Sequence, residues 1–564
     1  MSRTVAVRPL RAALDARPSR RRPVMPAAAL AVLALTAGCA QGASAGPAAT
    51  GGAPVPGGTL RFALGAEPTG VDPQQVGTNV SIYIARQLAD SLTDQDPETG
   101  EIVPWLAESW DVNDELTEFT FHLRDDVTFS DGTPLDAGTV KANFDALADG
   151  PLAASAPLAA SYLGGYEKSR VEDEHTVTVV LEAPDAQFLQ ATSTVSLAIL
   201  SEGTATADPA ERQQGELVGS GPFVLEEYTQ GQGAVITRRD GYDWASDAAA
   251  HDGEAYLDAV EFSVVPESGV RAGSLASGQV DAIGDVLPQD VPQVEGSGGQ
   301  VLNRNNPGVA FVLQANVNRP PLDDPDVRRA LLPAINRPEL VDTVLSDAFK
   351  PATSVLASTT PGYTDLSDEL VFDPEEAARL LDEAGWAEGP DGIREKDGEK
   401  LAFDVAYAPL FTGSEAVLEL VQQQLRAVGV DLELRRLTPA EQTAAQESGD
   451  FDTYYYNVTR ADADILRTQF AVGQRNLSFR EAPQGDDDAD PLDALLADAL
   501  AEPDAAARAE LAAGAQREIL DQALAIPLFE LAQSIGVRGE VHGVAFDASS
   551  RLLFRDAWID GGGQ

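Results

Sequence analysis

The sequence is poor in the residues that most often carry catalysis and metal binding. Its 564 residues include one cysteine, Cys39, and only four histidines. The histidines are His122, His175, His251 and His542, and no two of them stand at a metal-ligand spacing such as His-x-x-His. The chain also has no Gly-x-Ser-x-Gly nucleophile elbow and no Walker loop for phosphate. We therefore expect a protein that is not an enzyme, with no cofactor and no metal site.

The sequence also has few basic residues compared with acidic ones. Lysine and arginine together number 39 against 90 aspartates and glutamates, so the formal net charge at pH 7 is −51. A surface that binds nucleic acid needs the opposite sign, because it must neutralise phosphates. The excess of carboxylates indicates either a solvated acidic surface or attraction of cationic solutes. We therefore exclude nucleic acid as a partner and keep both interpretations of the acidic surface open.

The first 38 residues have the pattern of an export signal. Arginines crowd residues 3–22, and residues 25–37 are apolar but too short to span a bilayer comfortably. This stretch ends in Leu35-Thr36-Ala37-Gly38-Cys39, which resembles a lipobox, where a signal peptidase cuts before a cysteine that carries diacylglycerol. We expect residues 1–38 to be a signal peptide and Cys39 to be lipidated. A plain signal peptide with an incidental cysteine is the alternative, and the export route, general secretory or twin-arginine, stays open.

The rest of the chain divides into a tether and a large body. Residues 39–57 are rich in glycine, alanine and proline without periodicity, which is typical of a flexible tether. From residue 58 onward the chain is long enough for a large core and more than one lobe. Strand-like alternation, as in residues 177–181 and 259–265, is interleaved with segments of helical period. This order predicts a mixed α/β protein, in which no later segment is apolar enough to cross a membrane.

Local signals predict several element boundaries. Residues 119–123 alternate between apolar and polar side chains, as in a half-buried strand. The Ser-Asp-Gly-Thr-Pro run at 130–134 predicts a turn before a helix over residues 140–147. Asp324 and Pro325 predict the N-cap and first residue of another helix, because the carboxylate accepts orphan backbone N–H groups and proline has none. Such elements occur in many domains and assign no function by themselves.

One long segment resembles a single known family. It contains, in order, Leu106, Ala107, Ser109, Trp110, Phe121, Leu123, Arg124, Phe129, Ser130, Asp131, Gly132, Pro134 and Leu135. The same succession is found in the peptide, opine and nickel class, family 5, of extracytoplasmic solute-binding proteins, the capture components of ABC importers. Further phrases that resemble this family occur at residues 218–223, 277–281, 320–328 and 380–386. The resemblance therefore covers residues 58–558.

The resemblance implies a class C solute-binding protein. Its fold is α/β and two-lobed, of the periplasmic-binding-protein type II-like kind, with an extra subdomain in the first lobe. We place the first lobe in residues 58–83, 197–307 and 525–558, the extra subdomain in residues 84–196 and the second lobe in residues 308–524. The strand that begins at Ala525 is expected to return to the first lobe. The two lobes are expected to close about crossing segments near Gly308 and Pro527.

The segment at residues 451–467 is where this family faces the cleft from the second lobe. In the family's peptide binders it often reads Trp-x-Ala-Asp-Tyr, and that aspartate pairs with the α-amino group of the peptide. Ala461 and Asp462 match the Ala-Asp pair, whereas Thr459 and Ala463 stand in place of the two aromatic residues. The resemblance thus implies an amine-binding role for Asp462, while the aromatic side chains that accompany it in the peptide binders are missing.

Residues near Asp462 complete the predicted binding site. Arg460 and Arg467 have the chemistry to recognise a carboxylate or phosphate, or else they pair with Asp462 and Asp464 around a helix start. If residues 454–456 form a strand, its side chains alternate between faces, and one or two of these tyrosines are expected to line the cleft. The other candidate ligand-binding residues are Asn457, Tyr455, Tyr456, Val76, Gly77 and Thr78, of which the last three are placed at the cleft edge.

From this resemblance we predict that the protein captures an extracellular solute, in the first place an oligopeptide, and delivers it to an ABC importer permease. Import of an opine, a metal chelate or an oligosaccharide is an alternative. Another is a sensor or chaperone of the same fold that signals to a membrane receptor. We expect a monomer that is held on the extracytoplasmic face of the cell membrane only by its lipid anchor.

Overall fold

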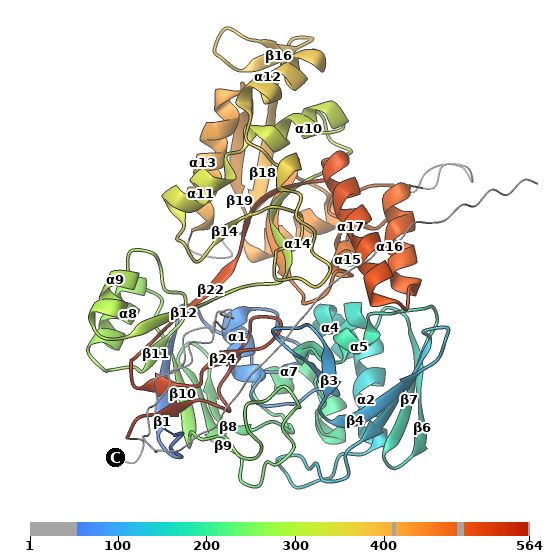
Figure 1. Ribbon diagram of the computed structural model, residues 1–564, viewed down its shortest axis with the longest axis vertical. Helices are drawn as coiled ribbons and strands as arrows, with labels where there is room; N and C mark the ends of the chain where they lie inside the picture. Colours follow the sequence, from blue (N-terminus) through green and yellow to red (C-terminus); the bar gives the residue numbers. More distant parts are fainter. Residues whose placement is uncertain (1–52, 409–412, 482–489, 562–564) are drawn as a thin grey trace, which may run out of the picture. The chain divides into compact units, whose positions relative to one another are not determined.

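The computed structural model describes residues 53–408, 413–481 and 490–561. The predicted signal peptide, Cys39 and most of the predicted tether therefore lie outside the described residues. The described part contains a seven-stranded, a six-stranded and a four-stranded sheet, each accompanied by helices (Figure 1). These correspond to a first lobe, a second lobe and an extra subdomain, so the predicted two-lobed α/β fold is confirmed.

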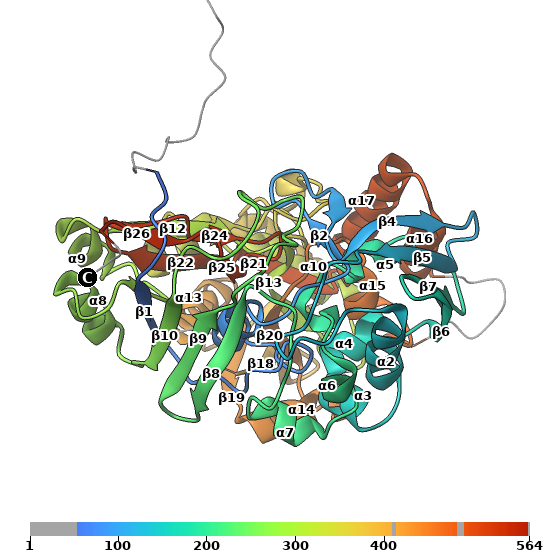
Figure 2. The same cartoon turned by 90° about the horizontal axis from the view of Figure 1, so that it is seen from below.

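The first lobe is built on a sheet with the strand order β12-β22-β11-β1-β10-β9-β8. Its strands are β1 (Thr59–Leu64), β8 (Phe223–Thr229), β9 (Gly233–Arg238), β10 (Ala259–Val264), β11 (Ala282–Ile283), β12 (Gln300–Asn305) and β22 (Ala532–Val537). Strand β1 pairs in parallel with β10 and β11, and β8, β9, β10 and β1 lie side by side in Figure 2. Phe62 on β1 packs 5.7 Å from Phe262 and 5.9 Å from Phe554, measured between ring centroids. The core of this lobe therefore joins distant parts of the chain.

Short helices and small strand pairs surround this sheet. The helices are α1 (Asn79–Ala85), α6 (Glu202–Ala205), α7 (Pro209–Gln213), α8 (Ser268–Ala276) and α9 (Val291–Gly296). The small strands are β2 (Thr93–Gln95), β3 (Ile102–Pro104), β23 (Val541–His542), β24 (Ala545–Phe546), β25 (Leu552–Leu553) and β26 (Trp558–Ile559). Strands β2 and β3 pair with each other near the site described below and, unlike the other small strands, fall within residues 84–196, the expected extra subdomain.

The extra subdomain has an antiparallel sheet with the order β4-β5-β7-β6. Its elements are β4 (Ala107–Val112), β5 (Glu118–Leu123), β6 (Tyr166–Asp173), β7 (Thr176–Leu181), α2 (Ala137–Ala148), α3 (Pro151–Ser155), α4 (Pro157–Tyr162), α5 (Phe188–Ala191) and the 3₁₀ turn η1 (Val195–Leu197). The predicted alternation is confirmed in β5, where Phe119, Phe121 and Leu123 are buried and the residues between them are half-buried. Phe119 packs on Phe188 of α5 at 4.9 Å between ring centroids, which fixes α5 against the sheet.

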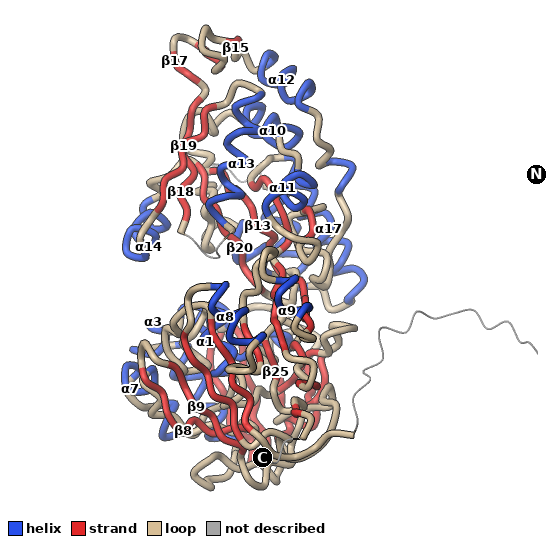
Figure 3. The backbone as a smooth tube through the Cα atoms, turned by 90° about the vertical axis from the view of Figure 1, so that its left-hand side faces the viewer, coloured by secondary structure: helices blue, strands red, loops and turns tan. Residues whose placement is uncertain are grey.

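The second lobe is built on a sheet with the order β14-β21-β13-β20-β18-β19. Its strands are β13 (Gly308–Ala315), β14 (Lys350–Pro351), β18 (Ala402–Tyr407), β19 (Asp431–Arg436), β20 (Thr453–Thr459) and β21 (Ala525–Glu530), with small strands β15 (Ala387–Glu388), β16 (Arg394–Lys396) and β17 (Glu399–Lys400). Its helices are α10 (Pro325–Ala334), α11 (Arg337–Val344), α12 (Pro374–Glu383), α13 (Ser414–Ala427), α14 (Pro439–Ser448), α15 (Ile465–Phe470), α16 (Pro491–Ala501), α17 (Ala505–Asp521) and the 3₁₀ turn η2 (Ser367–Glu369). Every residue of β13 and β21 is buried, because helices flank the sheet (Figure 3).

The chain crosses between the lobes twice. Strand β12 ends at Asn305 in the first sheet, and β13 begins at Gly308 in the second. The return crossing differs from the prediction. The strand that begins at Ala525 pairs with β13 in the second sheet, and only β22, from Ala532 onward, lies in the first. The return therefore occurs at Leu531, because the apolar run before it completes a strand buried on both faces.

Gly308 allows the first crossing to pass close to β20. Its φ is +108°, and a Cβ atom at this position would lie 2.1 Å from the carbonyl oxygen of Val458. A larger residue would clash there and would adopt an unfavourable backbone conformation. The glycine thus lets β13 start directly beside the end of β20, where the predicted binding segment begins.

The predicted helix start at Asp324 is also confirmed. The Asp324 carboxylate accepts a hydrogen bond of 3.0 Å from the backbone N–H of Asp326, and Pro325 is the first residue of α10. Both interactions involve residues that are neighbours in the sequence, which is why the sequence predicted them.

Candidate functional site

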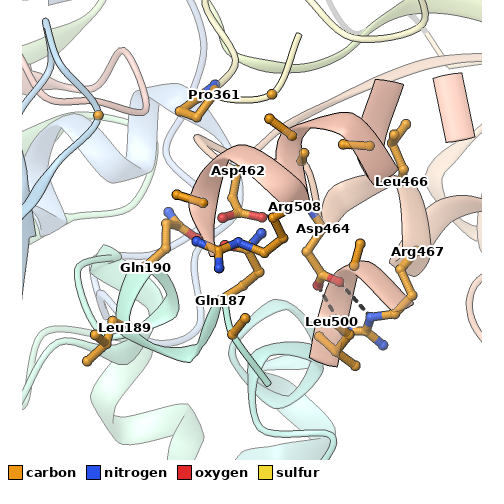
Figure 4. Close-up of a pocket in the computed structure, with 18 of the residues that line it drawn as sticks. Gln187, Leu189, Gln190, Pro361, Asp462, Asp464, Leu466, Arg467, Leu500 and Arg508 are labelled. Atoms are coloured by element: carbon orange, nitrogen blue, oxygen red, sulfur yellow. Dashed lines mark hydrogen bonds and ion pairs between the residues drawn. The ribbon is translucent and has the colours of Figure 1, made fainter. Parts of the chain in front are cut away.

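The extra subdomain and the second lobe enclose a cavity of about 280 Å³, called here the interlobe cavity (Figure 4). The wall from the extra subdomain and the strands before it comprises Gln95, Gly100, Ile102, Ala186, Gln187, Leu189 and Gln190. The wall from the second lobe comprises Pro361, Gly362, Asp462, Ala463, Asp464, Leu466 and Arg467, together with Leu496, Ala499, Leu500, Ala505, Arg508, Ala509 and Ala512 of α16, α17 and their ends. The cavity thus draws its residues from both sides of the cleft.

A second, smaller cavity of about 40 Å³ lies next to it. It is lined by Ile82, Arg86, Asp94, Gln95, Leu158, Tyr162, Ser193, Thr194, Val195, Ser196, Thr459, Asp547, Ala548, Ser549 and Arg551. Gln95 lines both cavities, and its side-chain amide donates a hydrogen bond of 3.0 Å to the carbonyl oxygen of Ala461. This bond is a direct contact between the first half of the chain and the second lobe, made by a residue that both cavities share.

Asp462 is the predicted site residue that lines the interlobe cavity. It belongs to the loop between β20 and α15, so the end of a central strand and the start of a helix hold it in place. Its side chain is buried, with 5% of the residue exposed, and one carboxylate oxygen accepts a 2.6 Å hydrogen bond from the backbone N–H of Asp464. Among the described residues, no basic side chain forms an ion pair with it. Burial raises its pKa to about 6, while the nearby charge of Arg460 opposes this shift.

Asp464, by contrast, is fully engaged by two arginines. Its carboxylate lies 3.1 Å from Nη1 of Arg460 and receives a bidentate pair from Arg467, at 2.6 Å from Nε and 2.8 Å from Nη2. Of the two interpretations given above for these arginines, the structure therefore has the pairing with carboxylates. The partner is Asp464, and Asp462 stays outside the network. The arrangement satisfies most of the charge around the start of α15 within the protein itself.

Arg460 also contacts the extra subdomain. Its guanidinium carbon lies 4.6 Å from the centroid of the Tyr162 ring, and its backbone N–H donates to the carbonyl oxygen of Pro307 in the crossing segment. Burial tends to lower the pKa of Arg460, but Asp464 and the other acidic groups around it together outweigh burial, and the pKa is raised. Arg460 thus holds two parts of the cleft together, and it is absent from the linings of both cavities.

The tyrosines of β20 do not line either cavity, contrary to the expectation that one or two would. Tyr455 stacks on Phe311 at 4.8 Å, and the hydroxyl of Tyr456 donates to Gln314. Both residues are buried because helices cover both faces of this central strand, so neither side of the alternation reaches the cleft. Asn457 is half-buried near the end of the same strand and is not among the cavity-lining residues either.

The predicted cleft-edge loop lies behind the smaller cavity. Val76 is buried against Ile82 and Val195, two residues that line that cavity. Gly77 and Thr78 are exposed, and the Thr78 hydroxyl donates to Ser81 at 3.1 Å. None of the three lines a cavity itself, so the loop supports the wall of the smaller cavity from behind.

The sequence did not indicate the charged groups of the smaller cavity. Arg86 is buried, and its guanidinium carbon lies 4.6 Å from the centroid of the Trp105 ring. A carboxylate oxygen of Asp94 lies 3.8 Å from Nη2 of Arg86, and one of Asp547 lies 3.8 Å from its Nε. Arg551 lines the same cavity and donates to the side chain of Asn79. These groups come together from opposite ends of the chain, and no local motif marks them. Gln95, Gln190 and Arg508 of the interlobe cavity were missed for the same reason.

Two further findings concern the described residues only. In residues 53–408, 413–481 and 490–561, no helix has both the length and the apolar character needed to cross a membrane. The same residues contain no group of three or more His, Cys, Asp or Glu side chains that could hold a metal ion.

Comparison with known proteins gives matches over most of the chain. Residues 101–468 match the family described as "Bacterial extracellular solute-binding proteins, family 5 Middle". The dipeptide-binding protein of Escherichia coli (strain K12) is 27% identical over 536 residues, covering 89% of this chain and 95% of that protein. The nickel-binding periplasmic protein of the same strain is 26% identical over 462 residues, covering 79% and 84%. The structure of NikA from Brucella suis in complex with Fe(III)-EDTA has a TM-score of 0.75 at 25% identity, covering 89% of this chain and 99% of that one.

Proposed function

The chain belongs to the bacterial extracellular solute-binding proteins of family 5, and on that premise we propose that it captures short peptides and delivers them to an importer permease. The family assignment makes it a solute-binding protein of ABC import. The choice of a peptide rests on one observation, the buried carboxylate of Asp462 in the interlobe cavity, which forms no ion pair among the described residues. The similarity to a dipeptide-binding protein supports the same choice.

The chemistry of Asp462 favours a ligand that carries an ammonium group. A buried carboxylate without a cation is unfavourable, because burial removes the water that would stabilise its charge. An ammonium supplies both the charge and the N–H donors, and the resulting hydrogen bond is stronger than one between neutral groups. The α-amino group of a peptide is such an ammonium at neutral pH. Arg460 and Arg467 are already engaged by Asp464, so Asp462 is the charged group of this loop that is free to meet a ligand.

Capture is proposed to occur by closure of the two lobes. The crossings at residues 306–307 and at Leu531 are the natural hinge, because each joins a strand of the first sheet directly to a strand of the second. Contacts such as those of Gln95 with Ala461 and of Arg460 with Tyr162 would form on closing and break on opening. Rigid lobes that rotate about a few crossing residues are a common way to bury a solute.

We also propose that Cys39 carries lipid and anchors the protein as a monomer on the extracytoplasmic face of the membrane. Cys39 lies outside the described residues, so this proposal rests on the lipobox alone. Two acyl chains make anchoring stable, since each buried CH₂ contributes about 0.8 kcal/mol. Cys39→Ser should release the protein into the medium or leave its signal peptide uncut. Retention in the membrane fraction with the signal peptide removed would overturn the anchor.

One experiment tests the proposed function as a whole. The purified protein is titrated with a pool of tripeptides and with the same pool after N-acetylation, and melting temperature and scattering radius are followed together. Free peptides at about a hundred times their dissociation constant should add about 2.7 kcal/mol of stability and compact the protein. The acetylated pool should do neither at that concentration, because it lacks the ammonium. Equal effects of the two pools, or no effect of either, would contradict peptide capture through Asp462.

A further inference from the structure

The buried polar groups on one side of the interlobe cavity are hydrogen-bond acceptors. Asp462 and Gln190 are both almost fully buried, with 5% and 4% of the residue exposed. The side-chain oxygen of Gln190 has no hydrogen-bond partner among the described residues, although its amide nitrogen reaches the oxygen of Gln95 at 3.4 Å. Figure 4 shows both side chains directed into the same part of the cavity. A ligand group placed there must therefore donate hydrogen bonds, as an ammonium does.

The less buried polar groups of the same cavity are donors. Arg508 on α17 is half-buried, and its Nη1 donates to the carbonyl oxygens of Glu502 at 2.7 Å and Pro503 at 3.0 Å. No carboxylate within the described part of the chain forms an ion pair with Arg508, and its Nε and Nη2 have no acceptor there. The side-chain amide of Gln187, which makes no hydrogen bond with the described residues, lines the same cavity (Figure 4). Together they offer N–H groups to a carboxylate.

Charged side chains of both signs surround the cavity. Three carboxylates, those of Asp185, Asp462 and Asp464, influence one another in this part of the molecule. Three guanidinium groups, those of Arg460, Arg467 and Arg508, accompany them. Asp462 and Arg508 both line the cavity, and neither forms an ion pair among the described residues. A ligand that carries an ammonium and a carboxylate can therefore place each end against a group of opposite charge.

Apart from Gln95 and the mutually paired Asp464 and Arg467, the remaining wall of the cavity is apolar. Its larger side chains are those of Ile102, Leu189, Leu466, Leu496 and Leu500. They have no hydrogen-bonding groups, so they favour an aliphatic or similar apolar substituent on the ligand.

We propose that the interlobe cavity binds a compact zwitterion with an apolar side chain. Its ammonium donates to Asp462 and Gln190, and its carboxylate accepts from Arg508 and Gln187. This inference rests on the proposed function and narrows it: both charged ends of the ligand must fit one cavity of about 280 Å³. A long peptide would carry its carboxylate outside, so the expected solutes are apolar amino acids and dipeptides. Arg508 is then a residue that determines specificity.

The test uses two probe series on the full chain without its signal peptide. One series is L-leucine, L-leucinamide and N-acetyl-L-leucine, and the other is Leu-Leu, Leu-Leu amide and N-acetyl-Leu-Leu. Affinities are measured by calorimetry for the wild type, Arg508→Gln and Arg508→Lys. Arg517→Gln is the matched control, because Arg517 is exposed on the same helix and does not line the cavity. The melting temperature of each empty variant is recorded, since Arg508 also bonds the carbonyls after α16.

In at least one series, amidation of the carboxyl group should weaken binding to the wild type and to Arg517→Gln by about tenfold or more. In Arg508→Gln the amide and the free acid should bind alike, and Arg508→Lys should restore part of the preference. A purely structural role of Arg508 would lower the melting temperature but leave the acid-to-amide ratio unchanged. The series with the larger amidation effect tells whether amino acids or dipeptides fit the cavity.

Two outcomes would overturn the inference, and they can be told apart. If amidation has no effect on the wild type while Asp462→Asn still weakens binding, the compact zwitterion is wrong and the proposed peptide function stands. If no compound of either series binds the wild type at millimolar concentration, the inference fails. The proposed peptide function is contradicted as well only if the tripeptide pools also fail to bind.

Discussion

Two buried carboxylates, those of Asp72 and Asp462, differ in how far the protein neutralises their charge. Asp72 in the first lobe is completely buried, and its oxygens lie 2.7 Å and 3.0 Å from nitrogens of Arg212, itself completely buried. The backbone N–H of Gln74 and the side chain of Gln75 also donate to it. Asp462 in the cleft receives one backbone hydrogen bond and no ion pair among the described residues. A charge that holds the fold together is saturated by the protein, whereas a charge kept for a ligand is left partly unsatisfied.

Removing the partner of Asp72 should produce the largest effect on stability. In Arg212→Met the carboxylate of Asp72 stays buried without its cation, so the free energy of unfolding should fall by about 3–5 kcal/mol. Urea denaturation measures this change. The matched control is Arg379→Met on α12, an exposed arginine that pairs with Glu376 and Glu383, and its loss should change the free energy of unfolding far less because exposed ion pairs contribute little. Equal losses of unfolding free energy in the two variants would contradict the claim that the buried pair of Asp72 and Arg212 holds the first lobe together.

Neutralising Asp462 should leave stability intact and weaken binding instead. Asp462→Asn should reduce the affinity for a ligand with a free ammonium by about 3 kcal/mol, roughly a hundredfold, because the buried cation loses its counter-charge. The empty variant should melt at the same temperature as the wild type or higher, since the fold no longer buries an unpaired charge. Asp464→Asn is the contrast: it deprives Arg460 and Arg467 of their partner and should lower the melting temperature.

The pH dependence of binding should show whether the ionised form of Asp462 is the one that binds the ammonium. The pKa of Asp462 is raised to about 6 from its ordinary value of 3.8, because burial disfavours the charged form. A raised carboxyl pKa means that Asp462 contributes most to the stability of the empty protein below pH 3.8, and that this contribution is lost as pH rises through about 6. Binding of an ammonium needs the ionised form, so affinity should fall about tenfold for each pH unit below about 6.

The control for this pH dependence must separate Asp462 from its neighbours. Arg460, Asp464 and Arg508 all influence Asp462, and burial raises the pKa of Asp185, close to Asp464, to about 7. Asp462→Asn should bind weakly with little change between about pH 5 and 7, whereas Asp185→Asn should keep the decline below about 6. Calorimetry over this range measures both, and a decline that persists in Asp462→Asn would assign it to another group.

The smallest expected effect concerns the hydrogen bond of Gln95, a residue that lines the interlobe cavity and joins its two sides. Gln95→Leu removes the 3.0 Å hydrogen bond to the carbonyl of Ala461, which should cost the closed state about 1 kcal/mol. Affinity should then fall by about fivefold, with less compaction on ligand binding in X-ray scattering. Gln293→Leu, on the exposed side of α9, should change neither quantity. A loss as large as that of Asp462→Asn would mean that Gln95 contacts the ligand itself.

The sequence could predict features whose causes are local. The strand at residues 119–123 and the helix start at Asp324 depend on side chains that are close neighbours in the chain, and both are present in the structure. The return crossing was misplaced because residues 525–530 are apolar on both faces, and such a run fits a central strand of either lobe. Only the pairing of β21 with β13 decides the question, and that pairing is a property of the folded chain.

The same distinction applies to the site. Asp462 lies in the interlobe cavity, where the family pattern suggested a cleft residue, because the motif encodes the loop after β20. For Arg460 the motif left open whether the side chain meets a ligand or a carboxylate, and only the folded chain shows its ion pair with Asp464. Gln190 and Arg508 belong to segments far apart in the chain and meet only through the packing of α5 against the second lobe. Their role follows from burial and unsatisfied atoms, which the sequence does not contain.

The most direct test of the central claim compares Leu-Leu and N-acetyl-Leu-Leu on the wild type and Asp462→Asn at about pH 7.5, by calorimetry. Acetylation removes the ammonium and the variant removes the carboxylate, so the two changes form a double cycle. We predict that acetylation weakens binding to the wild type by about a hundredfold and has almost no effect on the variant. An equal loss in both proteins, or full binding of the acetylated dipeptide by the wild type, would contradict the assignment of Asp462 as the ammonium acceptor.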